Sequence, residues 1–236
     1  LSSAMQRKYQ HLFFDLDRTL WDYDANAKET LCDIYEKYDL ASKGVDLDKF
    51  LHDFTRFNNI LWAQFRHGEI KKEYLKVRRF YLTLKSSQIK DNDLAKAASD
   101  DYLSISPEKT RLIPGAMELL EYLSGKYHMH IITNGFTEVQ FKKLRNCKLE
   151  KYFERIVTSD MVKANKPKKE IFHYALSGAN AQKSTSLMIG DDWDIDIMGA
   201  KYFGFDQVYF NRDGKELKGK ATYEIHSLEE LITILT

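Results

Sequence analysis

Long apolar runs, prolines and cysteines are the scarce features of this 236-residue sequence, which has three prolines and two cysteines. No apolar run approaches the length of a membrane span, so no membrane-spanning helix is expected. The N-terminal residues contain no long apolar segment and therefore no visible signal peptide. Leu1–Ala4 precede Met5 and are interpreted as an added remnant. Cys32 and Cys147 lie far apart without a CxxC motif, so free thiols in a reducing cytoplasm are the simplest interpretation.

Neither sign of charge is in excess, because 36 Lys and Arg residues nearly balance 35 Asp and Glu residues and leave a formal net charge of +1. A protein that binds nucleic acid through bulk positive charge is therefore not expected, although a local basic patch stays open. A content of 43% hydrophobic and 30% charged residues is typical of a globular protein. The length suffices for one large domain or for a domain with a smaller insert.

The spacing of apolar residues divides the chain into a helical segment and a segment in which strands and helices alternate. No strand pattern interrupts residues 24–106, where helices are expected at 25–38, 46–65, 70–84 and 93–103. Short apolar runs elsewhere predict strands at 10–15, 128–133, 155–158, 186–190 and 207–210, with 223–225 as a further candidate. Helices are expected between these strands, including one that begins at Pro167 and a last one that begins at Ser227.

This order of elements predicts an α/β protein. We expect a doubly wound parallel sheet with right-handed crossovers and an all-helical insert after the first strand. The α/β domain is placed at 1–20 and 108–236, and the helical domain at 21–107.

Two aspartates stand at the end of the first predicted strand. Asp15 and Asp17 follow the apolar run His11–Phe14 and lie on the same side of an extended chain, because side chains alternate along a strand. Ligands of open α/β sheets bind at the carboxyl ends of the strands. Two carboxylates there suit either a divalent-cation site or a nucleophile paired with an acid. A loop of solvated aspartates is the structural alternative.

Polar residues also follow three later strands. Thr133, Asn134 and Gly135 end the strand 128–133, Lys166 lies beyond the strand 155–158, and an aspartate-rich stretch from Asp191 to Asp196 follows the strand 186–190. Because the carboxyl ends of parallel strands meet at one edge of a sheet, we expect the four groups to converge there.

Each of these residues has a plainer interpretation. Thr133 could cap the following helix, and Lys166 could lie on the surface as most lysines do. The stretch Asp191–Asp196 could be a solvated acidic loop, whereas an EF-hand loop is excluded because Asp196 stands where that loop requires glycine. For the convergence to be accidental, all of these interpretations would have to hold together.

The four groups, in this order and with a helical insert between the first and the second, resemble the haloacid dehalogenase-like hydrolases. That superfamily consists mostly of magnesium-dependent phosphatases, and the resemblance covers essentially the whole chain. It implies a Rossmann-like core with a helical cap, a Mg²⁺ cofactor, and hydrolysis of a phosphate monoester through an aspartyl-phosphate.

The resemblance also implies a role for the residues of the first two groups. Asp15 would be the nucleophile and a metal ligand. Asp17 would act as general acid and then as general base, with its backbone carbonyl on the metal. Thr133 would bind the phosphoryl oxygens, together with the backbone N–H groups of Asn134 and Gly135.

The last two groups would complete the site. Lys166 would neutralise charge on Asp15 and on the phosphate, and Asp191 would be the third protein ligand of the Mg²⁺. Asp196 would hold metal-bound water or orient Lys166. Four aspartates within six residues leave open whether Asp192, Asp194 or Asp196 supports the metal.

Three stretches, one of them in the helical segment, resemble a particular branch of the superfamily. The stretches Asn58–Ile70, Ile132–Thr137 and Asn165–Phe172 are similar to the pyrimidine 5′-nucleotidases, which implies a nucleoside 5′-monophosphate as substrate, with a pyrimidine base favoured. Asn59 and Trp62 would then line the base pocket. Packing within the helix is the alternative for both residues.

Other functions remain open. A phosphatase for another small metabolite, such as a sugar phosphate or phosphoglycolate, is the main alternative, and Asp17 disfavours dehalogenation because dehalogenases of the superfamily lack this second aspartate. A non-catalytic phospho-acceptor, such as a receiver domain, or a binding homologue is the alternative of a different class, and the helical insert disfavours a receiver. We expect no nucleic-acid or membrane partner, a monomer or small homo-oligomer, and a cytoplasmic location.

Overall fold

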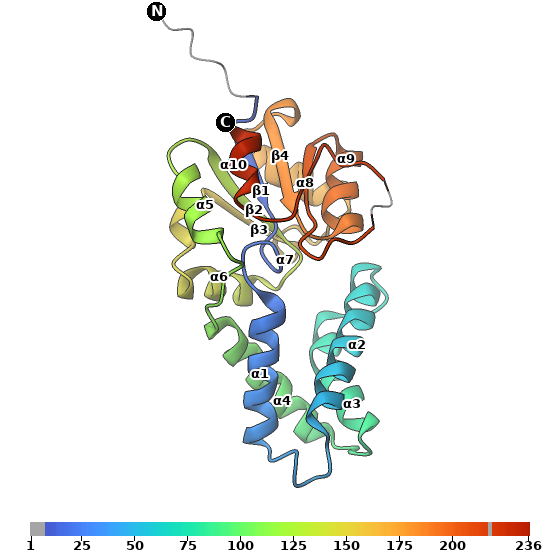
Figure 1. Ribbon diagram of the computed structural model, residues 1–236. Coiled ribbons are helices and arrows are strands. Elements are labelled where there is room, and N and C mark those ends of the chain that lie inside the picture. The colour runs from blue at the N-terminus through green and yellow to red at the C-terminus, as the bar shows by residue number, and fades with distance from the viewer. Residues whose placement is uncertain (1–7, 217–218) are drawn as a thin grey trace, which may run out of the picture. The chain divides into compact units, whose positions relative to one another are not determined.

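The computed structural model describes residues 8–216 and 219–236 (Figure 1), so the interpretation of Leu1–Ala4 lies outside the described residues. The chain divides into two compact units. The core unit comprises Leu1–Tyr23 and Thr110–Thr236, and the helical unit comprises Asp24–Lys109.

In the described part of the chain, the core unit contains a six-stranded parallel sheet with the strand order β3-β2-β1-β4-β5-β6. The strand β1 therefore lies at the centre, where Phe14 is in register with Ile131 of β2 and with Ile189 of β4. The predicted α/β fold with a parallel sheet is confirmed. The strands are β1 (His11–Phe14), β2 (His128–Thr133), β3 (Arg155–Thr158), β4 (Ser186–Gly190), β5 (Asp206–Phe210) and β6 (Tyr223–Ile225).

Helices cover both faces of this sheet (Figure 1). Leu12 and Phe14 belong to one hydrophobic cluster and Phe13 to another, because successive side chains of β1 point to opposite faces. All three side chains are fully buried, as expected for the central strand of a two-sided sheet. The first cluster includes residues of α5 (Ala116–Leu123), α6 (Thr137–Asn146) and α10 (Glu230–Leu235), and the second includes residues of α8 (Lys169–Gly178) and α9 (Met198–Phe203).

The helices expected to begin at Pro167 and at Ser227 begin later in the structure. The helix α8 begins at Lys169 with Lys168 as its N-cap residue, so Pro167 precedes the helix and follows a cis peptide bond. The helix α10 begins at Glu230 rather than Ser227. Glu230 still accepts hydrogen bonds from the backbone N–H groups of His226 and Ser227, at 3.0 and 2.9 Å, so a capping interaction forms before the regular helix starts.

The helical unit packs around aromatic residues. Its helices are α1 (Tyr23–Lys37), α2 (Leu47–Arg66), α3 (Lys72–Ser86) and α4 (Asn92–Ile105). Phe54, Phe80 and Tyr102 lie against one another with ring centroids 4.9 to 5.7 Å apart. The buried Arg79 guanidinium lies 4.6 Å from the Tyr102 ring centroid and donates a 3.0 Å hydrogen bond to Asn58. A buried cation is thus held by aromatic faces and an amide oxygen.

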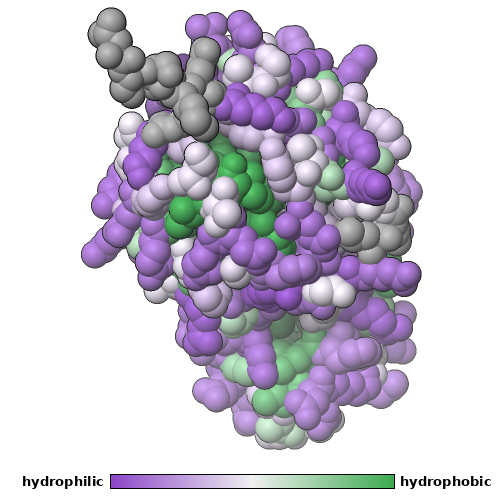
Figure 2. Space-filling model, turned by 45° about the horizontal axis from the view of Figure 1, so that its top comes forward, coloured by the Kyte–Doolittle hydropathy of each residue, from purple (hydrophilic) through white to green (hydrophobic). Residues whose placement is uncertain are grey.

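The two chain segments that lead out of and back into the core unit run side by side. Trp21 and Leu112 form an antiparallel bridge, and the backbone N–H of Asp22 donates a 3.0 Å hydrogen bond to the carbonyl of Arg111. No described helix has both the length and the apolar character needed to cross a membrane. The face shown in Figure 2 is mainly hydrophilic, with apolar residues visible between the polar ones.

Candidate active site

The nucleophile predicted from the sequence stands directly at the end of the central strand. The backbone N–H of Asp15 continues the sheet by donating a 2.9 Å hydrogen bond to the carbonyl of Ile189. The chain then turns tightly, because the carbonyl of Leu16 accepts from the N–H groups of Leu20 and Trp21, each at 2.9 Å. Asp15 is therefore fixed by the sheet on one side and by this turn on the other, with 8% of its surface exposed.

Lys166 is bonded to Asp15, and all three donors of its ammonium group are used. Its ammonium nitrogen donates three hydrogen bonds of 2.7 Å, to Asp15 Oδ1, to Asp196 Oδ1 and to the carbonyl of Ile132. An ammonium group has three donors, so all of them have a partner. Only 1% of the residue is exposed, so the structure gives no support to a surface position for Lys166.

Three carboxyl groups from two distant parts of the chain meet next to this lysine. Ligand oxygens of Asp15, Asp191 and Asp196 all lie within 4.8 Å of one another. The Thr19 hydroxyl, which the sequence reasoning missed, lies 3.4 Å from Asp15 Oδ2 and 3.3 Å from Asp191 Oδ1. A Cβ atom on Gly190 would lie 2.4 Å from Asp196 Oδ2, so the strand end must be glycine for Asp196 to fit.

The electrostatics of this cluster favour a bound cation. Burial raises the pKa values of Asp15, Asp191 and Asp196, while the charge of Lys166 opposes this on Asp15 and Asp196. Burial alone would lower the pKa of Lys166, but the two carboxylates raise it above its usual value. Three carboxyl groups and one ammonium leave negative charge without a counterpart inside the cluster. Oxygen ligands of this kind fit a hard divalent cation such as Mg²⁺.

The four aspartates after β4 lie in different surroundings. Asp192 caps a short π-helical segment, Trp193–Ile197, and its Oδ1 accepts from the N–H groups of Asp194 and Ile195 at 3.0 and 2.9 Å. Asp194 is exposed, whereas Asp196 is buried. This geometry brings Asp196 to the cluster and leaves Asp192 and Asp194 with a local structural role and an exposed position, respectively.

The residues after β2 lie on the same edge of the sheet. The Thr133 hydroxyl accepts a 3.1 Å hydrogen bond from the backbone N–H of Gly135, and Thr133 is almost fully buried. The Asn134 side chain holds the backbone of Lys166 by two hydrogen bonds, donating to its carbonyl at 3.0 Å and accepting from its N–H at 2.7 Å. The Asn134 amide thus positions the loop that carries Lys166.

Asp17 is held by two residues of α6 that the sequence reasoning also missed. Lys143 Nζ donates to Asp17 Oδ1 at 2.6 Å, and Gln140 Nε2 donates to Asp17 Oδ2 at 3.0 Å. Both residues are nearly inaccessible, with 4% of Lys143 and 0% of Gln140 exposed. Their spacing of three places them on one helix face. Because Lys142 is adjacent and also basic, the sequence alone does not indicate which of the two lysines is buried.

The two cap residues predicted to contact the base lie on α2 of the helical unit. Asn59 is exposed, and Trp62 is half-buried and packs edge-on against Phe65, with ring centroids 5.6 Å apart. Packing within the helix therefore accounts for part of the Trp62 surface. Asn58, the neighbour of Asn59, is instead buried and bonded to Arg79.

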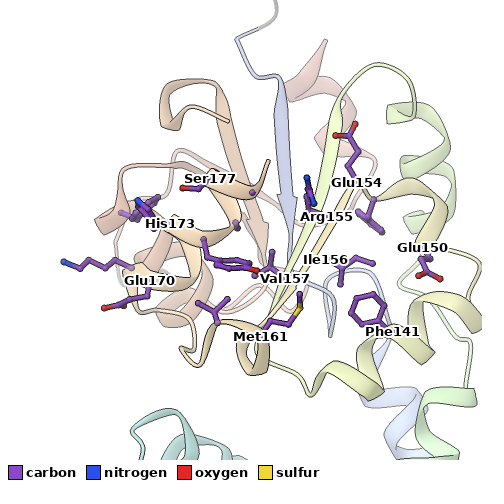
Figure 3. Close-up of a pocket in the computed structure, with 17 residues that line it drawn as sticks. Phe141, Glu150, Glu154, Arg155, Ile156, Val157, Met161, Glu170, His173 and Ser177 are labelled. Carbon is purple, nitrogen blue, oxygen red and sulfur yellow. The ribbon is translucent and has the colours of Figure 1, made fainter. Parts of the chain in front are cut away.

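A separate groove of about 1110 Å³ lies along β3, the terminal strand of the sheet (Figure 3). It is lined by Ile156 and Val157 of β3, Phe141 of α6, Met161 of α7 (Ser159–Val162) and residues of α8. None of the residues gathered around Asp15 lines it. The groove is therefore distinct from the candidate active site.

The chain is similar to known hydrolases over almost its whole length. The family model described as haloacid dehalogenase-like hydrolase matches residues 9–204. The chain is 31% identical over 231 residues to pyrimidine 5′-nucleotidase YjjG of Escherichia coli, an alignment that covers 97% of this chain and 98% of the relative. It is 30% identical over 239 residues to glyceraldehyde 3-phosphate phosphatase of Pyrococcus furiosus, an alignment that covers 97% of this chain and 94% of that relative. The magnesium-bound crystal structure of the HAD-hydrolase YfnB from Bacillus subtilis has a TM-score of 0.87 and 29% identity, with 97% and 99% covered.

Proposed function

This chain belongs to the haloacid dehalogenase-like hydrolases and is a phosphate monoester hydrolase, and we propose that it is a Mg²⁺-dependent phosphatase acting through an aspartyl-phosphate on a nucleoside 5′-monophosphate. The observation that carries the mechanism is the meeting of Asp15, Lys166 and Asp196 at the carboxyl end of the central strand, with Asp191 beside them. A non-catalytic phospho-acceptor would need no second carboxyl group such as Asp17 to protonate a leaving group.

The first half-reaction transfers the phosphoryl group to Asp15. A carboxylate oxygen of Asp15 attacks phosphorus, the bond between phosphorus and the ester oxygen breaks, and Asp17 gives its proton to the departing alkoxide. Lys166, already bonded to Asp15 Oδ1, offsets negative charge that gathers at the nucleophile and the phosphate. The Thr133 hydroxyl donates to a phosphoryl oxygen.

The second half-reaction restores the enzyme. Asp17, now ionised, takes a proton from water as the water oxygen attacks the phosphorus bonded to Asp15, and the bond between phosphorus and Asp15 breaks to release inorganic phosphate. A Mg²⁺ ion held by Asp15, Asp191 and Asp196, with the backbone carbonyl of Asp17, would supply positive charge that stabilises the transferring phosphoryl group. Catalysis by positioning and charge is typical of phosphoryl transfer.

The choice of a nucleotide rests on the helical unit and on the Escherichia coli relative. Asn59 is exposed and Trp62 is half-buried on α2, so both retain surface with which to contact a base. We expect Asn59→Ala and Trp62→Ala to raise the KM for uridine 5′-monophosphate and leave the KM for p-nitrophenyl phosphate unchanged. Unchanged KM values for the nucleotide would exclude these residues from the base pocket.

A sugar phosphate or phosphoglycolate is the second candidate substrate. It is favoured by the nearly equal identity to a glyceraldehyde 3-phosphate phosphatase. Release of phosphate from a panel of nucleoside monophosphates, sugar phosphates and phosphoglycolate, with Mg²⁺ and with a chelator, separates the two. Asp15→Asn is the control, and we expect it to stay folded and to release no phosphate from any ester.

A further inference from the structure

Two buried residues of α6 connect the general acid to the phosphate-binding hydroxyl. The Gln140 amide nitrogen lies 3.0 Å from Asp17 Oδ2 and 2.6 Å from Thr133 Oγ1, so one amide group bonds to both. The Lys143 ammonium bonds to the other oxygen of the Asp17 carboxylate at 2.6 Å. We infer that Gln140 and Lys143 are positioning residues that orient Asp17 for proton transfer and Thr133 for phosphate binding.

The contacts of Thr133 determine what its hydroxyl group can still do. A hydroxyl group donates one hydrogen bond and accepts two. Thr133 Oγ1 already accepts from Gln140 Nε2 at 2.6 Å and from the backbone N–H of Gly135 at 3.1 Å. Its remaining capacity is the O–H donor, which is what a phosphoryl oxygen requires. Gln140 therefore makes Thr133 a donor toward the substrate.

The glycine after Asn134 allows this contact. A Cβ atom at position 135 would lie 2.4 Å from the Gln140 amide carbon and 2.5 Å from its nitrogen. Any side chain there would displace the Gln140 amide from Thr133 and Asp17. The close approach explains why the turn after β2 carries a glycine whose backbone is also bonded to Thr133.

Lys143 fixes the other half of the Asp17 carboxylate. Its ammonium nitrogen lies 4.0 Å from the centroid of the Trp21 ring, and only 5% of its side chain is exposed. A lysine held by an aromatic face and a carboxylate has little freedom to move, so the carboxylate it binds is held in a fixed place. A proton donor works efficiently only when it is placed within hydrogen-bond reach of the departing oxygen.

The inference rests on the proposed function, so the test measures both with two esters. Uridine 5′-monophosphate has an alkoxide leaving group that needs protonation. p-Nitrophenyl phosphate releases a weakly basic nitrophenolate, which departs without being protonated. For Lys143→Met, which keeps the aliphatic stem near Trp21, we expect kcat/KM for the nucleotide to fall about 10- to 100-fold, and kcat/KM for the aryl ester to fall less than about threefold. We expect kcat to fall for both esters, because the water step is common and also uses Asp17.

Gln140 should show a different pattern. Gln140→Met removes the amide donor at nearly constant volume, and Thr133 touches the phosphoryl group of either ester. We therefore expect kcat/KM to fall for both esters, by about 10-fold, which is the effect of one lost hydrogen bond of about 1.4 kcal/mol. Lys143→Arg should recover most of the nucleotide activity, and Lys142→Met, an exposed neighbour on α6, should behave like the wild type.

The possible outcomes separate the inference from the proposed function. Equal losses of kcat/KM on the two esters in Lys143→Met, with a lowered melting temperature, would show a purely structural role and overturn the inference. Lys143→Gln repeats the measurement if the methionine variant does not fold. If the wild type released no phosphate from any ester in the panel, the proposed function would fail and the inference would fall with it.

Discussion

The buried His130, near the strand ends that lie away from Asp15, predicts that mild acid removes one contribution to the stability of the fold. His130 is fully buried on β2, and its Nε2 lies 3.1 Å from Nδ1 of His11 on β1. Burial, together with the nearby His11, lowers the pKa of His130 from 6.5 to about 4, and the charge of Glu154 opposes this shift. The His128 ring stacks on His11, with ring centroids 4.9 Å apart, and is the third histidine of the group.

The sign and size of the effect follow from proton linkage. Because the folded-state pKa lies below the unfolded-state value, the unfolded chain binds a proton first as the pH falls. The stability contribution is therefore complete above pH 6.5 and is lost between pH 6.5 and about 4. The loss from His130 amounts to about 2 kcal/mol at pH 5 and about 3 kcal/mol below pH 4.

Urea unfolding at pH 7.5 and pH 5.0 measures this loss. We expect the free energy of unfolding of His130→Phe to fall by about 2 kcal/mol less than that of the wild type between the two pH values. The pKa values of the buried active-site carboxyl groups are raised, so these groups change stability in the opposite direction as the pH falls. They are present in both the wild type and the variant, and the difference between the two proteins therefore isolates His130. His173→Phe, an exposed position on α8, is the control. Equal losses in His130→Phe and the wild type would refute the reasoning.

Three further predictions concern the site and the helical unit. Gly190→Ala should lower stability by about 1–3 kcal/mol and greatly reduce phosphate release, because the new Cβ atom would collide with Asp196; activity equal to the wild type would contradict this. Millimolar Mg²⁺ should raise the melting temperature of the wild type but not of Asp191→Asn, because a bound ion stabilises only the folded state; an equal rise in both would exclude Asp191 as a ligand. Arg79→Met should destabilise the protein to urea by about 2 kcal/mol through loss of its aromatic and amide contacts, whereas the half-exposed Arg78→Met should have little effect.

The sheet could be predicted because its strands carry a strong local signal. The run Leu12–Phe14 is apolar without interruption, and it becomes the central strand with both faces covered. Parallel pairing then brings every strand end to one edge, so Asp15, Thr133 and Asp191 could be expected near one another without knowledge of any contact.

The sequence could not settle details that depend on tertiary contacts. The π-helical turn Trp193–Ile197 decides which aspartate points to Asp15, and helical periodicity does not foresee such a turn. Pro167 suits the first turn of a helix by its own preference, yet it packs against Gly199, with the helix starting two residues later. The burial of Gln140 and Lys143 likewise depends on the loop they contact.

The antiparallel pairing of Trp21 with Leu112 means that the whole helical unit leaves and re-enters the core at a single point. Joining Asp22 to Arg111 by a short turn would therefore close the core chain without altering any strand of the sheet. An insertion anchored in this way can be lengthened, exchanged or redesigned as a module. The residues around Asp15 remain on the core unit, which does not include the insertion.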